Sequence, residues 1–407
     1  MRREPQMVCQ ARPVRELDRL TRVRIQGFRS ARDVAFAPPR FCGLVGEPGA
    51  GKSNVLSAIW KLLSLAAEPT PDESSSADGR LLLEATVGGR SISLEARSGE
   101  PPIRLGEPPP ALFLPAALRS DEVVAPAEPA SGAVARVLDV LRGPLEARTA
   151  SAAAPALAFV DGLEACAAAG ITGLVLLIEE PELFLRPHAQ RHLYRLLREF
   201  AAVGNQVLYS THAPAFLNVG RLDELAFVQY RASIGTTVFQ PEPLPADESF
   251  RAVSEVDAER SELFLGRAAL LVEGRTEKLV FPLIFRALGY DLDREAISIV
   301  ECGGKPNVAL FARICDAVRI PYVVVHDRDA PRGREPIEGE RVINAEIARI
   351  AGEDRAVVLE PDFEGVAGLT GHGHKPERAW RTFARDGHAI PDQLVEVVRR
   401  VVSLVGD

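Results

Sequence analysis

Acidic residues gather at two places in the C-terminal part of the sequence. Glu273 ends an apolar run and is followed by a glycine and, four residues later, by Glu277. Asp327 and Asp329 end a second apolar run as an Asp-x-Asp pair. Residues two apart on an extended chain point the same way, so both aspartates could reach the same ions. Converging carboxylates repel one another unless cations bind, so the pattern predicts a Mg²⁺ or Mn²⁺ site for phosphodiester cleavage.

Each of these acids also has an ordinary structural explanation. Glu277 would be favoured in the first turn of a helix by the helix dipole, with Thr276 as the cap. Asp327 and Asp329 could simply open a loop. Either pattern alone is explained as well by structure as by function. Their joint occurrence at two strand ends of one alternating unit favours the metal site.

A glycine-rich segment near the N-terminus has the pattern of a phosphate-binding loop. Residues 46–53 match GxxxxGK[ST], with an apolar strand before them and a helical pattern after them. The glycines let backbone N–H groups curl around phosphates, Lys52 reaches the terminal phosphates, and the Ser53 hydroxyl is a Mg²⁺ ligand. We therefore predict an ATP site. Its expected nucleotide-binding residues are Gly46, Gly49, Gly51, Lys52, Ser53, Asn54 and Glu179.

Two further strand ends carry polar side chains that suit the same chemistry. The apolar run 174–178 delivers Glu179 and Glu180 to the strand end where open α/β sheets bind ligands. One acid could hold Mg²⁺ while the other orients or deprotonates the attacking water. A second run, 206–209, leads to His212 near the γ-phosphate. Alone, each would read as a solvated turn; with the phosphate loop upstream, they favour ATP hydrolysis.

Strands and helices must alternate to position these residues. In the N-terminal part we predict strands 23–28, 41–45, 81–87, 91–96, 111–115, 174–178 and 206–209, and helices 53–65, most of 137–166, and one after Pro187. In the C-terminal part we predict strands 268–273, 297–301, 321–326 and 355–360, and helices 276–288, 306–318 and 339–351. Such alternation implies α/β domains with parallel sheets covered on both faces. We expect a leader (1–20), a first domain (21–240), a polar, proline-containing linker (241–262) and a second domain (263–407).

Composition limits the remaining possibilities. A chain of 407 residues exceeds one ordinary core, which favours two domains. The net charge of −8 gives no general attraction to nucleic acid, so DNA would be held by local basic patches or metal ions. Five cysteines without a CxxC pair argue against a disulfide framework or a zinc ribbon. No apolar run is long enough to span a bilayer, and no signal peptide is evident; we expect a cytoplasmic protein without a membrane partner.

The nucleotide motifs resemble those of ABC-type ATPases of recombination and defence, through "VRIQGFRSARDVAF" before the loop and "IEEPELFLRP" at the acid pair. The resemblance implies Glu179 as the metal-side acid, Glu180 as the catalytic base and His212 as the switch histidine. Three departures stand out: Glu179 replaces the usual Asp, residues 184–187 replace His-x-His-Pro, and residues 149–153 lack the glycine pair of a signature loop. ATP binding is therefore a firmer expectation than rapid hydrolysis.

A Glu at one strand end and an Asp-x-Asp at another resemble a TOPRIM domain, and Gly303-Gly304-Lys305 and "EPDFE" fit that pattern. An ABC head followed by TOPRIM is the layout of the OLD (overcoming lysogenization defect) family of ATP-dependent nucleases, a resemblance that covers roughly residues 20–385. It implies an ABC-type P-loop ATPase domain followed by a Rossmann-like TOPRIM α/β domain. It also implies Lys375 as the stabiliser of charge on the scissile phosphate and Lys305 as a phosphate contact. The implied metal ligands are Glu273, Glu277, Asp327, Asp329 and Glu364, with Ser53 and Glu179 at the ATP site.

The resemblance implies ATP and Mg²⁺ or Mn²⁺ as cofactors, and ATP-gated nicking or cleavage of DNA in anti-phage defence or DNA repair. The expected partners are DNA, further copies of the chain in a homodimer or larger assembly, and a second defence-system protein. An alternative is an ATPase whose TOPRIM domain is a non-cutting scaffold for DNA or a partner. A nucleotidyl transferase or topoisomerase-like enzyme ranks lower, because none of the five tyrosines stands in a nucleophile motif.

Overall fold

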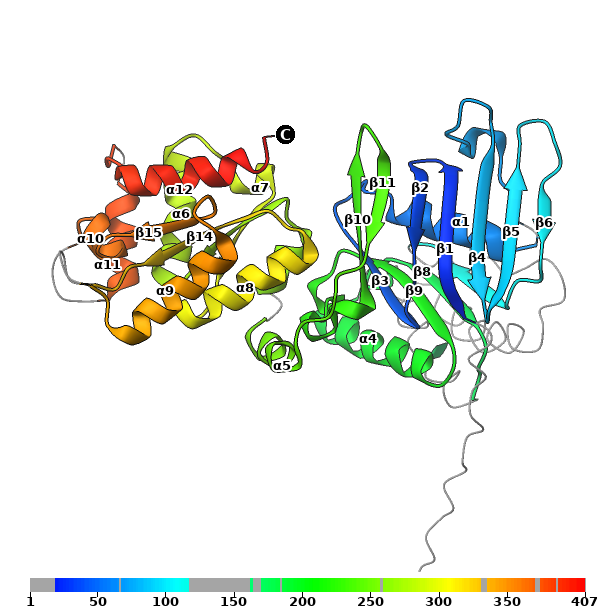
Figure 1. Cartoon of the computed structure of the whole chain (residues 1–407), viewed down its shortest axis with the longest axis horizontal. Coiled ribbons are helices and arrows are strands. Elements are labelled where there is room, and N and C mark those ends of the chain that lie inside the picture. Colours follow the sequence, from blue (N-terminus) through cyan, green and yellow to red (C-terminus); the bar gives the residue numbers. More distant parts are fainter. Residues whose placement is uncertain are drawn as a thin grey trace, which may run out of the picture. The chain divides into compact units, whose positions relative to one another are not determined.

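The chain folds into two compact units, seen in a computed structural model (Figure 1). Unit 1 contains residues up to Leu217 together with Asp223–Gln240, and unit 2 contains Asn218–Leu222 and Pro241–Asp407. The structure describes residues 19–65, 67–116, 162–163, 170–183, 185–256, 259–330, 335–369, 374–385 and 387–406. Within these ranges, no helix has the length and apolar character to cross a membrane.

Unit 1 contains two sheets. The first is antiparallel, in the order β2-β1-β4-β5-β6. Its strands are β1 (Leu20–Phe28), β2 (Ala31–Phe36), β4 (Leu81–Val87), β5 (Arg90–Ala96) and β6 (Ile103–Leu105). The second has the order β11-β10-β3-β9-β8-β7 and is parallel except for the β10–β11 hairpin. Its strands are β3 (Phe41–Val45), β7 (Ala111–Leu114), β8 (Val175–Glu179), β9 (Gln206–Thr211), β10 (Leu225–Arg231) and β11 (Gly235–Phe239).

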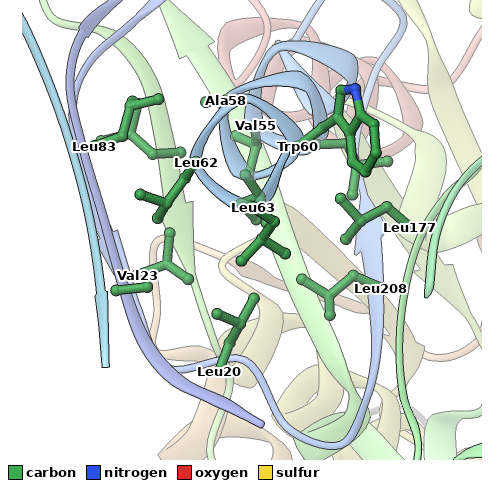
Figure 2. Packing of buried hydrophobic residues seen from close by; sticks show 14 of the residues in the cluster. Leu20, Val23, Val55, Ala58, Trp60, Leu62, Leu63, Leu83, Leu177 and Leu208 are labelled. Atoms are coloured by element: carbon green, nitrogen blue, oxygen red, sulfur yellow. The ribbon is translucent and has the colours of Figure 1, made fainter. Parts of the chain in front are cut away.

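Helix α1 (Lys52–Leu63) is buried between the two sheets. Figure 2 shows its side chains between Val23 and Leu83 of the first sheet and Leu177 and Leu208 of the second. Apolar residues surround most of this helix, as expected of one enclosed on two sides. Successive residues of a strand face opposite sides, so Ile178 points away from α1 and packs with helix α4 (Pro187–Ala202). The short helices of this region are η2 (Pro71–Glu73), η3 (Pro214–Phe216) and η4 (Val219–Glu224).

Unit 2 is built on a fully parallel sheet in the order β13-β12-β14-β15. The strands are β12 (Ala268–Val272), β13 (Ile297–Glu301), β14 (Tyr322–Asp327) and β15 (Ala356–Leu359). Helices α6 (Arg275–Ala287), α11 (Lys375–Phe383) and α12 (Asp392–Ser403) pack on one face, and α8 (Lys305–Val318) and α9 (Glu338–Ala351) cover the other. The remaining helices are α5 (Ala246–Glu255), η5 (Arg260–Leu265), α7 (Leu292–Glu295) and α10 (Phe363–Val366). Strand β12 therefore lies beside β14, although β13 separates them in sequence.

Most predicted strands and helices are present within a few residues of their expected ends, because each carries a clear apolar periodicity. The sequence patterns do not predict β2, β6, β10 or β11. The first sheet of unit 1 is antiparallel, so the prediction of parallel sheets is wrong for this half of the unit. Residues 241–262, expected as a linker, contain α5, whose first turn carries two acids. The predicted leader, most of helix 137–166 and the 149–153 loop lie outside the described residues.

Candidate functional site

The phosphate loop, residues 46–53, rests on the β10–β11 hairpin. Gly51 has φ +102°, and a Cβ atom there would lie 2.1 Å from Thr236 Oγ1. A Cβ on Gly46 would lie 2.1 Å from the carbonyl oxygen of Val228. Thr236 of β11 donates a hydrogen bond to the Ala50 carbonyl (2.9 Å), and this bond holds the loop against the hairpin. Glycine is required at Gly46 and Gly51 because a side chain at either position would clash with the hairpin and because both have a positive φ.

Lys52 lies inside this loop. Its Nζ donates to the carbonyl oxygens of Gly46 (2.8 Å) and Glu47 (3.0 Å). Burial lowers the pKa of Lys52 to about 8, partly offset by nearby acids that include Glu180. A buried ammonium that donates to neutral carbonyl oxygens is suited to bind phosphate oxygens, because these supply the negative charge that the carbonyl groups lack.

Strand β8 brings Glu179 to the start of α1. The Ala116 N–H lies 3.4 Å from Glu179 Oε2. Burial is the main cause that raises the pKa of Glu179, and the nearby Ser53 hydroxyl is among the groups that oppose it. A hydroxyl and a carboxylate near each other beside a phosphate loop have the donor chemistry that Mg²⁺ prefers. These residues therefore fit the predicted metal.

Glu180 and His212 meet at the ends of β8 and β9. His212 Nε2 lies 3.6 Å from Glu180 Oε1, and each side chain is 32% exposed. Glu180 adopts φ 44°, a left-handed conformation that a glutamate rarely takes and that is common at functional turns. Burial and the charge of Lys52 lower the pKa of His212. The predicted acid and histidine thus lie together, open to solvent, beside the lysine of the loop.

Asn54 follows Ser53 in the first turn of α1, and its side chain is engaged with protein groups. Its Nδ2 donates to Ser30 Oγ (2.6 Å), and its Oδ1 accepts from Arg29 (3.3 Å). Arg29 also pairs with the buried Glu73 at 2.8 Å. The amide of Asn54 therefore helps to hold the start of α1 against the turn between β1 and β2.

One acid at this site, Glu182, is not predicted by the sequence patterns. Glu182 is buried, and one of its carboxylate oxygens accepts hydrogen bonds from the segment that carries His212. The available signal was a third carboxylate after the acid pair, directly after Pro181 in "EEPE". A charged residue there would ordinarily be read as part of a solvated turn, because hydrogen-bond partners 29 to 31 residues away cannot be assigned from the sequence.

In unit 2, a cavity of about 380 Å³ opens at the carboxyl ends of β12 and β14. Strand order reverses between these two strands, which is where open parallel sheets bind ligands. The lining residues are Glu273, Gly274, Arg275, Thr276, Glu277, Glu301, Gly303, Gly304, Asp327, Glu364 and Lys375. The Asp327 N–H donates to Glu273 Oε1 (2.7 Å), and the Phe363 N–H donates to Asp327 Oδ1 (2.8 Å).

Burial raises the pKa of three acids of this cavity, Glu273, Glu277 and Asp327. Burial, opposed by a hydrogen bond from the Asp327 N–H, raises the pKa of Glu273 to about 7. Burial and then the charge of Glu273 raise the pKa of Asp327 to about 8. Burial likewise raises the pKa of Glu277. Buried carboxylates that repel one another around a cavity suit hard divalent cations, so the donor set fits Mg²⁺ or Mn²⁺.

Helix α6 begins at Arg275, with Gly274 at its N-cap and no capping side chain, so the prediction of Thr276 as a cap is wrong. The backbone N–H groups of Gly274 and Glu277 oppose the burial that raises the pKa of Glu277. Glu277 therefore lies in the first turn of the helix, where the dipole favours an acid, while it lines the cavity.

Asp329 does not line the cavity. The extended strand ends at Asp327, and Asp329 has φ 55°, so the expected alternation stops between them. Asp329 Oδ2 lies 2.8 Å from the buried Lys305 Nζ, which also contacts Glu340 at 3.0 Å. The expectation that both aspartates point the same way is therefore wrong. Lys305 is an internal ion-pair partner here rather than a free phosphate contact.

Lys375 and Glu364 face each other at the other wall of the cavity. Lys375 Nζ lies 2.7 Å from Glu364 Oε1, and this pairing raises the pKa of Lys375. Lys375 is 64% exposed, so its ammonium remains accessible from solvent. In the described part of the chain, no three His, Cys, Asp or Glu side chains stand close enough to hold a metal ion as they are placed. The acids line one cavity without forming a closed ligand cage.

Comparison with known proteins matches two segments of the chain to family models. Residues 264–329 match the family described as "Overcoming lysogenization defect protein-like, TOPRIM domain". Residues 156–218 match "AAA domain, putative AbiEii toxin, Type IV TA system". The chain is 33% identical over 213 residues to the OLD nuclease of Thermus scotoductus. These similarities support the OLD family for this chain. The α/β fold is that of an ATPase domain followed by a TOPRIM domain.

The chain spans less than half the length of the curated relatives it matches. The Thermus match covers 48% of the chain and 40% of the relative. The Old nuclease of Escherichia phage P2 is 27% identical over 162 residues, covering 38% of the chain and 28% of the relative. Solved structures with similarity include the C-terminal region of the Burkholderia pseudomallei OLD protein (20% identity, 35% of this chain, 88% of that chain, TM-score 0.23). Another is the Smc head domain bound to ScpA derived from Pyrococcus furiosus (12% identity, 58% and 98%, TM-score 0.41).

Proposed function

We propose that this OLD-family chain is an ATP-binding and ATP-hydrolysing endonuclease that cuts DNA with Mg²⁺ or Mn²⁺. The observation that carries the proposal is the cavity of unit 2, where Glu273, Asp327 and Lys375 meet at a reversal of strand order. The nuclease names of the relatives and the phosphate loop in the same chain support it. The ATPase domain would regulate the cut.

At the nuclease site the chain's own residues would divide the work. Glu273, Glu277, Asp327 and Glu364 would hold the metal, and Lys375 would neutralise charge on the scissile phosphate. A bound divalent ion supplies Lewis-acid chemistry and lowers the pKa of its water. Asp329, tied to Lys305, would act from outside the cavity by fixing the turn after β14.

At the ATP site, Lys52 and the loop backbone would bind the phosphates, and Ser53 and Glu179 would hold Mg²⁺. Glu180 would accept the proton of the attacking water, with His212 beside it. By family likeness we further propose that the chain acts in the cytoplasm, in anti-phage defence or DNA repair, as a homodimer or larger assembly. A second defence-system protein would be its partner.

A plasmid-nicking assay tests the nuclease. The full chain should convert supercoiled DNA to open circles in Mn²⁺ or Mg²⁺, with ATP varied separately. Asp327→Ala should abolish nicking, because it removes a buried cavity carboxylate. Asp293→Ala, an exposed acid of α7 outside the cavity, is the matched control and should nick normally. Unchanged nicking by Asp327→Ala would refute the site.

A second function, a TOPRIM unit that binds DNA or a partner without cutting, is favoured by two observations. The described acids form no closed metal cage, and Asp329 is neutralised by Lys305. Calorimetry with Mn²⁺ separates the two functions. Binding heat that is lost in Glu273→Gln supports the nuclease, and absence of binding to the wild type supports the scaffold.

A further inference from the structure

Glu182 joins the two strand ends of the ATP site. It follows Glu180 by two residues and is 7% exposed. Its Oε1 accepts hydrogen bonds from Thr211 Oγ1 (2.7 Å), the His212 N–H (2.8 Å) and the Ala213 N–H (3.2 Å). One carboxylate oxygen therefore accepts three hydrogen bonds from the last residue of β9 and the two residues after it.

The sheet cannot supply this restraint itself. The pairing of β8 with β9 ends at Glu179 and Ser210, and β9 ends at Thr211. His212 lies beyond the last strand hydrogen bond, where a loop would ordinarily move more than the strands. The carboxylate of Glu182 holds the backbone of His212 at this point, and the imidazole then lies 3.6 Å from Glu180.

The second oxygen of Glu182 makes a purely stabilising role a poor explanation. Oε2 is buried and meets no hydrogen-bond donor among the residues that the structure describes. A buried acceptor without a donor is unfavourable. This side chain nevertheless lies two residues after Glu180 and holds the backbone of His212, so its place in the fold points to a role at the reaction site.

We propose that Glu182 is a positioning residue for ATP hydrolysis, which holds His212 against Glu180 so that both groups address the terminal phosphate. The inference rests on the proposed ATP hydrolysis at this site. Glu182 would act through His212 and would not touch the nucleotide itself.

Steady-state ATP hydrolysis by the full chain tests this role. Glu182→Ala should lower kcat by roughly 10- to 100-fold, because small misplacements of catalytic groups have effects of this size. The KM for ATP should change less than about threefold, since the phosphate loop is intact. Glu182→Gln keeps an oxygen acceptor for the three donors and should retain most of kcat. Glu199→Ala, an exposed acid of α4, is the matched control and should behave as wild type.

A double-mutant cycle decides whether Glu182 acts through His212. The variant Glu182→Ala/His212→Ala should be no slower than His212→Ala alone, because the second change removes what the first one positions. The proposal would be overturned if the losses of kcat in the two single variants multiplied in the double variant. It would also be overturned if Glu182→Ala had a wild-type kcat, or if its KM rose by as much as its kcat fell.

Two further measurements keep the outcomes separate. If Glu182→Ala fails to fold, Thr211→Val removes one of the three donors without changing side-chain size, and it should lower kcat in the same direction. A wild type that binds a fluorescent ATP analogue but does not hydrolyse ATP would refute hydrolysis, and the role of Glu182 with it. A hydrolysing wild type with an unaffected Glu182→Ala would refute the role of Glu182 alone.

Discussion

At the scale of single residues, the acids of unit 2 connect charge, stability and metal binding. The folded-state pKa values of Glu273 and Asp327, about 7 and about 8, lie above the ordinary carboxyl range near 4. The folded chain therefore binds more protons than the unfolded chain between about pH 4 and about pH 8. The stability that these groups contribute is fully present below about pH 4 and is lost as pH rises to about 8.

Metal affinity should follow the opposite trend. Carboxylates bind metal in their ionised form, so Mn²⁺ affinity should rise from about pH 6 to about pH 8.5, with protons released on binding. Calorimetry in two buffers of different ionisation enthalpy measures both quantities. Asp327→Asn should flatten the dependence, whereas Asp293→Asn should not. An affinity that does not change over this range would contradict the assigned protonation.

The same two acids predict how unfolding responds to pH. Without metal, the melting temperature should fall between about pH 5 and about pH 8, and Glu273→Gln should reduce that fall. The change removes a group whose ionised form is unfavourable in the folded state. A melting temperature of Glu273→Gln that falls as steeply as that of the wild type would show that other groups set the slope.

At the scale of elements, the β10–β11 hairpin and the phosphate loop act as one structure. Thr236 of β11 donates to Ala50 of the loop and shares a hydrogen bond with Ser30, which accepts from Asn54. The hairpin thus links the loop, the first turn of α1 and the turn between β1 and β2. This arrangement explains why the loop tolerates no side chain on the hairpin side.

Gly51→Ala should therefore impair both folding and ATP binding. The new Cβ would meet Thr236 Oγ1 at 2.1 Å in a left-handed backbone, so we expect a loss of about 2–4 kcal/mol in unfolding free energy. ATP affinity should fall more than about tenfold because the loop must shift. The matched control is Gly99→Ala, with a similar φ of +81° and open space around the Cβ. Equal losses of stability in the two variants would mean that the contact with Thr236 adds nothing.

At the scale of the whole molecule, each unit has its own buried core and its own ligand chemistry. A ligand that binds only the folded form stabilises it by an amount that grows with the logarithm of ligand concentration relative to the dissociation constant. ATP should therefore stabilise unit 1, and divalent metal without nucleotide should stabilise unit 2.

Scanning calorimetry of the full chain tests this separation. ATP with Mg²⁺ should raise the temperature of one unfolding transition in the wild type but not in Lys52→Ala. Mn²⁺ alone should raise the temperature of a transition in the wild type but not in Asp327→Ala. Hydrogen exchange would assign each transition to its unit. One transition that responds to both ligands in both variants would show that the units unfold together.

Features that depend on residues close together in the sequence could be predicted from the sequence. The apolar run 41–45, the glycines after it and the helical spacing from Ser53 predict the phosphate loop, because all the required residues lie within one strand-loop-helix segment. The runs ending at Glu273 and Asp327 likewise predict strand ends with acids. The sequence does not predict β10 and β11, because a strand such as β10 depends on pairing with β3, which lies far away in the sequence.

The sequence by itself determined the two chemistries: phosphate binding at residues 46–53 and carboxylate clusters at the ends of two apolar strands. Only the tertiary structure decided which acids share a cavity. The order β13-β12-β14-β15 places Glu273 beside Asp327, while Lys305 draws Asp329 away and Glu182 turns inward to the segment of His212. The physical reason is that hydrogen bonds and ion pairs form between groups tens of residues apart, and periodicity along the chain carries no information about such partners.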